Sequence, residues 1–107
     1  MMRFWMVVAV LGAFAGVSAH AAEVGSPRAG LALAHDICAE CHVVHEEQLT
    51  VSVVGLPSFP DIAAQPERTE TWLRAFLVTP HHQMPNYVFR ENQIDDLVAY
   101  FESLKVK

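Results

Sequence analysis

The sequence has few of the residues that mark several common classes of protein. It contains only two cysteines, and its 12 acidic side chains outnumber its 7 basic ones, which gives a formal net charge of −5. This acidic balance argues against nucleic acid or an anionic membrane as a partner. The sequence also has no internal repeat and no sustained strand-like alternation. Neither a repeat array nor a β-rich fold is therefore expected.

Only one long apolar run is present, and it lies at the N-terminus. Arg3 gives the first residues a positive charge, and the run from Phe4 to Val17 carries no charged side chain. As a helix this run would be about 21 Å long, short of the roughly 30 Å hydrocarbon core of a bilayer. Ala19-His20-Ala21 then offers an A-x-A cleavage site, so residues 1–21 are expected to be a secretory signal peptide. An uncleaved membrane anchor is the alternative.

The remaining residues, 22–107, are expected to form one small all-α domain with a marginal core. Apolar side chains recur at helical spacing in three stretches, which predict helices over 26–41, 69–79 and 91–105. Ser26-Pro27 is a good start for the first of these helices. Gly30 inside it indicates a close approach of another helix. The prolines and glycine between 43 and 66 predict a loop.

The two cysteines lie in Cys38-Ala39-Glu40-Cys41-His42, a pattern typical of covalent c-type haem attachment. If both cysteines are helical, their spacing puts the two sulfurs on one face. Each sulfur could then form a thioether with one vinyl group of the porphyrin. His42 follows directly and could provide the first axial ligand to the iron.

Three other interpretations of the motif were open. A thioredoxin-like pair would want a βαβ context, and none is visible. A tetrahedral zinc site needs two more ligands, for which His45, His81 and His82 are available. A disulfide is possible in an oxidising compartment but would leave His42 without a role. Otherwise His35 and His45 are expected to be solvated, and haem attachment is the favoured interpretation.

The sixth ligand of the iron is expected to be Met84. It is the only methionine after the leader, and it lies in the loop from Pro80 to Pro85 between two predicted helices. Prolines on both sides restrict this loop, which helps to hold a weak thioether bond to iron. The alternative is that the Met84 side chain only packs in the hydrophobic core. His81 or His82 could instead bind the iron and give bis-histidine ligation.

With these motifs, the chain resembles the class I monohaem cytochromes c, the small bacterial members in particular. The resemblance covers nearly all of the sequence after the leader. It rests on Gly30-x-x-Leu33-Ala34-x-x-x-Cys38-Ala39-Glu40-Cys41-His42, Pro57-Ser58-Phe59, Phe76-Leu77-x-x-Pro80-His81-x-x-Met84-Pro85 and Leu97-Val98-Ala99-Tyr100-Phe101-x-x-Leu104. It departs from the family at Ala34, where an aromatic residue is usual, and in its acidic surface.

The resemblance implies a cytochrome c fold, in which three main helices and loops wrap around one covalently attached haem c. The first and last helices would cross at Gly30, with Leu97 and Tyr100 packing over it. Pro57 would offer its carbonyl to the Nδ1–H of His42, which orients the ring. Trp72 would pack near the haem, with simple helix-core filling as the alternative.

The function implied is one-electron transfer in the periplasm, without enzymatic activity. Partners would be redox proteins in small, transient contacts, and the mature chain would be a monomer with no stable membrane insertion. Two alternatives belong to other functional classes of haem protein. One is a haem subunit held permanently in a dehydrogenase or oxidase complex. The other is a ligand-binding haem sensor or peroxidase, which would apply if Met84 is not a firm ligand.

Overall fold

The computed structural model describes residues 16, 24–80 and 84–105, and in these residues the chain is all-α. Its helices are α1 (Pro27–Ile37), α2 (Phe59–Ala64), α3 (Glu70–Val78) and α4 (Glu91–Lys105). The expected signal peptide lies outside the described residues except for Gly16, and so do His81 and His82. None of the described helices combines the length and apolar character needed to span a bilayer.

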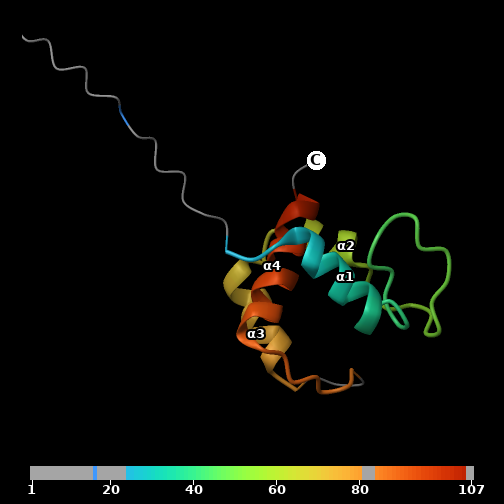
Figure 1. Ribbon diagram of the computed structural model, residues 1–107. Coiled ribbons are helices and arrows are strands. Elements are labelled where there is room, and N and C mark those ends of the chain that lie inside the picture. Colours follow the sequence, from blue (N-terminus) through green and yellow to red (C-terminus); the bar gives the residue numbers. More distant parts are fainter. Residues whose placement is uncertain (1–15, 17–23, 81–83, 106–107) are drawn as a thin grey trace, which may run out of the picture.

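The long C-terminal helix α4 is the centre of the fold. Each of the other three helices packs against it, and α1 crosses it in Figure 1. The apolar face predicted for the last helix is confirmed, because six consecutive or near-consecutive α4 residues are buried: Ile94, Leu97, Val98, Ala99, Tyr100 and Phe101. Ala34 from α1, Phe59 and Ala63 from α2, Leu73 from α3, and Cys38 and Val44 from the turn after α1 also belong to the core. Haem-motif residues at the end of α1 are thereby fixed relative to α4.

The crossing of α1 and α4 depends on the missing side chain at Gly30. A Cβ built at Gly30 would overlap the backbone carbonyl oxygen of Asp96 and would lie 2.7 Å from the Cβ of Tyr100. The close approach predicted from Gly30 is therefore confirmed, and Tyr100 is one of the residues that pack over it. Asp96 also receives a hydrogen bond from the backbone N–H of Ser26, 2.8 Å from its Oδ1.

The helix starts follow their capping residues. The Ser26 hydroxyl accepts from Ala29 N–H at 3.2 Å, and the Thr69 hydroxyl accepts from Trp72 N–H at 3.2 Å. Each satisfies one of the N–H groups that a helix start leaves unpaired. At the start of α4 the side-chain Oε1 of Gln93 accepts from Arg90 N–H at 2.9 Å, as in half of a capping box. The predicted starts at residues 26, 69 and 91 are confirmed to within one residue.

Two expectations for the segment between Cys38 and Pro66 were wrong. The first helix was expected to reach Cys41, but it ends at Ile37 and Cys38 is its C-cap. The stretch 43–66 was expected to be all loop, but it contains α2, so the domain has a fourth helix. The Ser58 hydroxyl accepts from Asp61 N–H at 3.1 Å and Pro60 lies in the first turn, where a missing N–H costs nothing.

Candidate functional site

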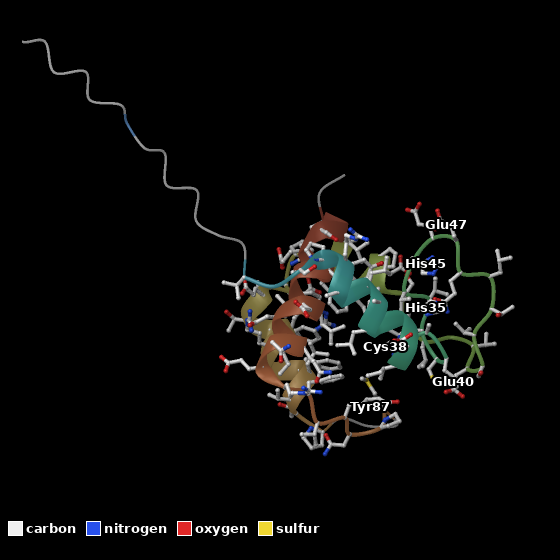
Figure 2. All side chains as sticks on the ribbon, in the orientation of Figure 1. His35, Cys38, Glu40, His45, Glu47 and Tyr87 are labelled. Atoms are coloured by element: carbon white, nitrogen blue, oxygen red, sulfur yellow. The ribbon has the colours of Figure 1, made fainter. Side chains whose placement is uncertain are left out.

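The Cys-x-x-Cys-His motif forms a compact turn at the end of α1. The carbonyl of Cys38 accepts from His42 N–H at 2.8 Å and from Cys41 N–H at 3.1 Å. Cys38 is buried and directly follows the last residue of the helix, whereas Cys41, three residues further on, is half-buried. In Figure 2, Cys38 lies at the lower end of α1, and Tyr87 lies on the segment beneath it. The motif is thus held by local hydrogen bonds although it is not part of the helix proper.

The two thiols are neighbours but are not joined in a disulfide. Burial, together with a smaller effect of the nearby Cys41, raises the pKa of the Cys38 thiol to about 11. A dithiol redox centre needs the opposite, a thiol whose pKa is lowered so that the thiolate forms at neutral pH. The buried Cys38 thiol therefore lacks the environment of a thioredoxin-type site.

A zinc site around the motif has no support in the part of the chain that is described. No group of three His, Cys, Asp or Glu side chains there is arranged to hold a metal ion. A structural zinc site has four such ligands in tetrahedral geometry. The thiols of Cys38 and Cys41 therefore find no further zinc ligands among the described residues.

The ring of His42 is oriented by one hydrogen bond. Its Nδ1 lies 2.8 Å from the carbonyl oxygen of Pro57. Because a carbonyl can only accept, Nδ1 must carry the hydrogen, and the lone pair of the neutral ring then lies on Nε2. A hydrogen bond of this kind fixes the tautomer and orientation of a metal-binding histidine and makes it a stronger donor. The ring also lies 5.8 Å from that of Phe59, centroid to centroid, and Phe59 stacks on Phe101 at 4.4 Å.

The structure describes Met84 and Trp72 in different surroundings. Met84 is half-buried in the segment that leads from α3 to α4. Trp72 is half-buried on α3, its ring stacks on that of Phe76 with centroids 4.7 Å apart, and the guanidinium carbon of Arg68 lies 3.9 Å from the ring centre. Trp72 also packs against the hydrophobic core. Roles for Met84 at iron and for Trp72 beside a haem stay predictions.

Two residues at the base of the site were not singled out by sequence reasoning. Gln48 makes hydrogen bonds to four backbone groups around the motif, including the carbonyl of His42 at 2.8 Å. Val44 is completely buried, and its carbonyl accepts from the Tyr100 hydroxyl at 2.5 Å. No local sequence pattern predicts these hydrogen bonds of Gln48, because its partners are backbone atoms that only the folded turn brings together.

The expectation that His35 and His45 are solvated holds for only one of them. The His35 side chain is 65% exposed, whereas that of His45 is 27% exposed. The buried Nδ1 of His45 lies 3.7 Å from Glu47 Oε2 and has no hydrogen-bond partner among the described residues. The two rings stack with centroids 6.2 Å apart and lie on the same side of the motif in Figure 2.

The described residues fit a covalently attached haem. The motif offers two free, adjacent thiols and an imidazole whose Nε2 is available. Exposed apolar side chains also lie next to the segments that carry Pro57 and Met84, among them Leu56, which is 40% exposed, Tyr87, which is 37% exposed, and Val88, which is 94% exposed. An apolar macrocycle would remove surface of this kind from water, which is favourable by roughly 25 cal/mol per Å².

Comparisons with known proteins agree with this fit. The chain is 38% identical over 88 residues to cytochrome c-552 of Bradyrhizobium diazoefficiens, an alignment that covers 82% of this chain and 81% of the relative. No family model and no solved structure matches the chain. Identity at this level over most of both chains, together with the Cys-x-x-Cys-His turn, shows that the chain belongs to the c-type cytochromes, electron carriers whose haem is bound covalently through such a motif.

Proposed function

We propose that this c-type cytochrome is a periplasmic carrier of single electrons, whose haem iron is bound by His42 and Met84. The hydrogen bond between His42 Nδ1 and Pro57 O, at 2.8 Å, is the observation that carries the proposal. It leaves Nε2 of His42 free to bind iron and holds the ring in one orientation. When bound, the haem provides an iron that accepts and gives up one electron.

The chain's own residues account for the other requirements of an electron carrier. The thiols of Cys38 and Cys41 would tether the group to the end of α1, so that it is not lost between partners. The thioether of Met84, the only methionine after the proposed leader, would close the remaining position on the iron. A methionine ligand favours the reduced state and so raises the potential. With His42 and Met84 both holding the iron, no substrate would bind at the metal.

The charge around the motif indicates the kind of redox partner. Glu40 within the motif and Glu46 and Glu47 in the loop after it are exposed, and Figure 2 shows Glu40 and Glu47 on the side of that loop. A partner with a basic surface would be attracted to these carboxylates. We expect its association rate to fall as salt is added, because exposed charges are screened beyond about 10 Å at 0.1 M salt.

The absorption spectrum of the mature holoprotein tests the proposed ligation. The wild type should be low-spin in both oxidation states, should show the weak iron–sulfur charge-transfer band when oxidised, and should not change when CO is added to the reduced form. Met84→Ala should lose that band and bind CO. A high-spin wild type, or one that binds CO readily, would replace the carrier by a sensor or peroxidase.

Two simpler measurements test the rest of the proposal. N-terminal sequencing of protein recovered from the periplasm should begin at Ala22, as cleavage after Ala21 predicts. Size-exclusion chromatography of the mature protein should give a monomer. Co-purification with a fixed partner in stoichiometric amount would instead identify a permanent subunit of a larger complex.

A further inference from the structure

The turn that carries His42 leaves backbone carbonyls in need of donors. α1 ends at Ile37, so the carbonyls of Ala39 and His42 lie beyond the helix, where its regular hydrogen-bond pattern no longer supplies their donors. The side-chain amide nitrogen of Gln48 lies 2.8 Å from the carbonyl oxygen of Ala39 and 2.8 Å from that of His42. One side chain from the following loop thus satisfies two carbonyls of the haem-attachment motif.

The same amide also binds the loop to itself. Its nitrogen lies 3.1 Å from the carbonyl oxygen of Thr50, and its oxygen accepts from Val44 N–H at 2.9 Å. These contacts fix which way the amide points, because three carbonyls require the NH₂ end and one N–H requires the oxygen. A carboxylate could keep only the contact to Val44, and an apolar side chain could keep none of the four.

The position of Gln48 connects the ligand to the core. On one side it holds the His42 backbone, while the His42 ring is held separately by Pro57. On the other side it holds Val44, whose carbonyl accepts from the Tyr100 hydroxyl of α4. The backbone of the ligand therefore has a chain of hydrogen bonds to the buried face of α4 that runs through one glutamine.

We infer that Gln48 is a positioning residue for His42: its amide holds the backbone of the motif so that the His42 ring keeps its contact with Pro57. This inference rests on the proposed ligation of iron by His42. Gln48 would touch neither the haem nor the iron. Its effect must therefore be measured at the His42 ring, separately from its effect on the stability of the whole protein.

The test uses reduced holoprotein and two substitutions at the same site. Gln48→Met keeps the length of the side chain and removes all four hydrogen bonds, whereas Gln48→Glu keeps only the oxygen that faces Val44. Gln65→Met is the matched control, because Gln65 is also half-buried but its side chain makes no hydrogen bond among the described residues. NMR would follow hydrogen exchange of the His42 Nδ1–H, with the amide of Leu97 in α4 as the global reference.

We expect the ratio of the His42 Nδ1–H exchange rate to the Leu97 amide rate to rise about tenfold in both Gln48 variants, the order of change that loss of several hydrogen bonds allows. It should stay near the wild-type value in Gln65→Met. The midpoint potential of Gln48→Met should rise, because an imidazole less firmly bound to Pro57 is a weaker donor to the oxidised iron.

An unchanged ratio in both Gln48 variants would overturn the inference, and so would equal acceleration of both protons, since that is a loss of global stability alone. An unchanged potential in Gln48→Met would leave Gln48 a purely structural role and would overturn it too. If Gln48→Met does not mature, Gln48→Glu carries the test. A low-spin wild type with Met84-dependent absorption would uphold the proposed function even if the Gln48 inference failed.

Discussion

The crossing of α1 and α4 makes the protein sensitive to the single change Gly30→Ala, outside the haem motif. A methyl group there meets the backbone carbonyl of Asp96 and lies 2.7 Å from the Cβ of Tyr100. Neither atom can rotate away, because one belongs to the backbone and the other is the first atom of its side chain. The two helices must therefore separate, and the buried face of α4 loses contact with α1.

The expected magnitude combines two opposing terms. Overpacking of this kind costs about 1–3 kcal/mol, and the rigid neighbours place this site near the upper end. Alanine at an interior helix position gains about 1 kcal/mol over glycine. The net loss should be about 2 kcal/mol in the free energy of unfolding, which lowers the Tm of a domain of this size by about 10 °C.

Thermal and urea unfolding of the holoproteins, followed by far-ultraviolet circular dichroism, would measure this loss. Ala32→Gly is the matched control, because Ala32 is an exposed residue of the same helix and reports the propensity term alone. It should lose about 1 kcal/mol. If Gly30→Ala instead gained stability by a similar amount, Gly30 would be an ordinary open helix position and the proposed crossing would be refuted.

The hydroxyl of Tyr100 and the guanidinium of Arg74 give two further predictions. Tyr100→Phe leaves the buried carbonyl of Val44 without its donor and should cost about 1–3 kcal/mol in urea unfolding. Burial raises the pKa of Tyr100 above its ordinary value of 10.0, so its contribution is constant below about pH 10 and is lost as the pH rises further. Tyr100→Phe should lack this alkaline loss, and an identical pH profile would contradict the assignment. Arg74 binds Asp95 of α4 at 2.6 Å and Glu70 at 3.2 Å, and its side chain is one-third exposed. Arg74→Met should therefore lower the free energy of unfolding by about 1 kcal/mol or less. The difference in unfolding free energy between the variant and the wild type should shrink in 1 M salt.

Sequence patterns predicted the parts of the fold that local chemistry decides. Ser26 and Thr69 were recognisable as helix starts because a hydroxyl in the right place satisfies an unpaired N–H. The apolar stripe of α4 and the need for glycine at position 30 follow from burial and close approach. In the same way, Ser58 with Asp61 three residues later is a helix-start signal, and it could have revealed α2. The prolines in this stretch indicated a loop instead.

The parts that could not be predicted depend on contacts distant in the sequence. α1 ends at Ile37, and in the turn that follows it Gln48, from a later loop, binds the carbonyls of Ala39 and His42. Cysteines three residues apart can lie on one side of a helix or of a non-helical turn. The motif alone therefore could not show where the helix ends. The likeness to known cytochromes indicated the bond between His42 and Pro57, but composition and periodicity did not.

The hydrogen bonds around the motif indicate how the core reaches the ligand. His42 follows a helix end, where the backbone has fewer internal hydrogen bonds than within the helix. Its ring is held by Pro57 and its carbonyl by Gln48, while Val44 donates its N–H to the Gln48 side-chain oxygen and accepts at its carbonyl from the Tyr100 hydroxyl. Since Tyr100 also packs over Gly30, the helix crossing and the turn share one side chain of α4. A change that shifts α4 should therefore move the exchange rate of the His42 Nδ1–H as well as the free energy of unfolding, and Gly30→Ala should show both effects.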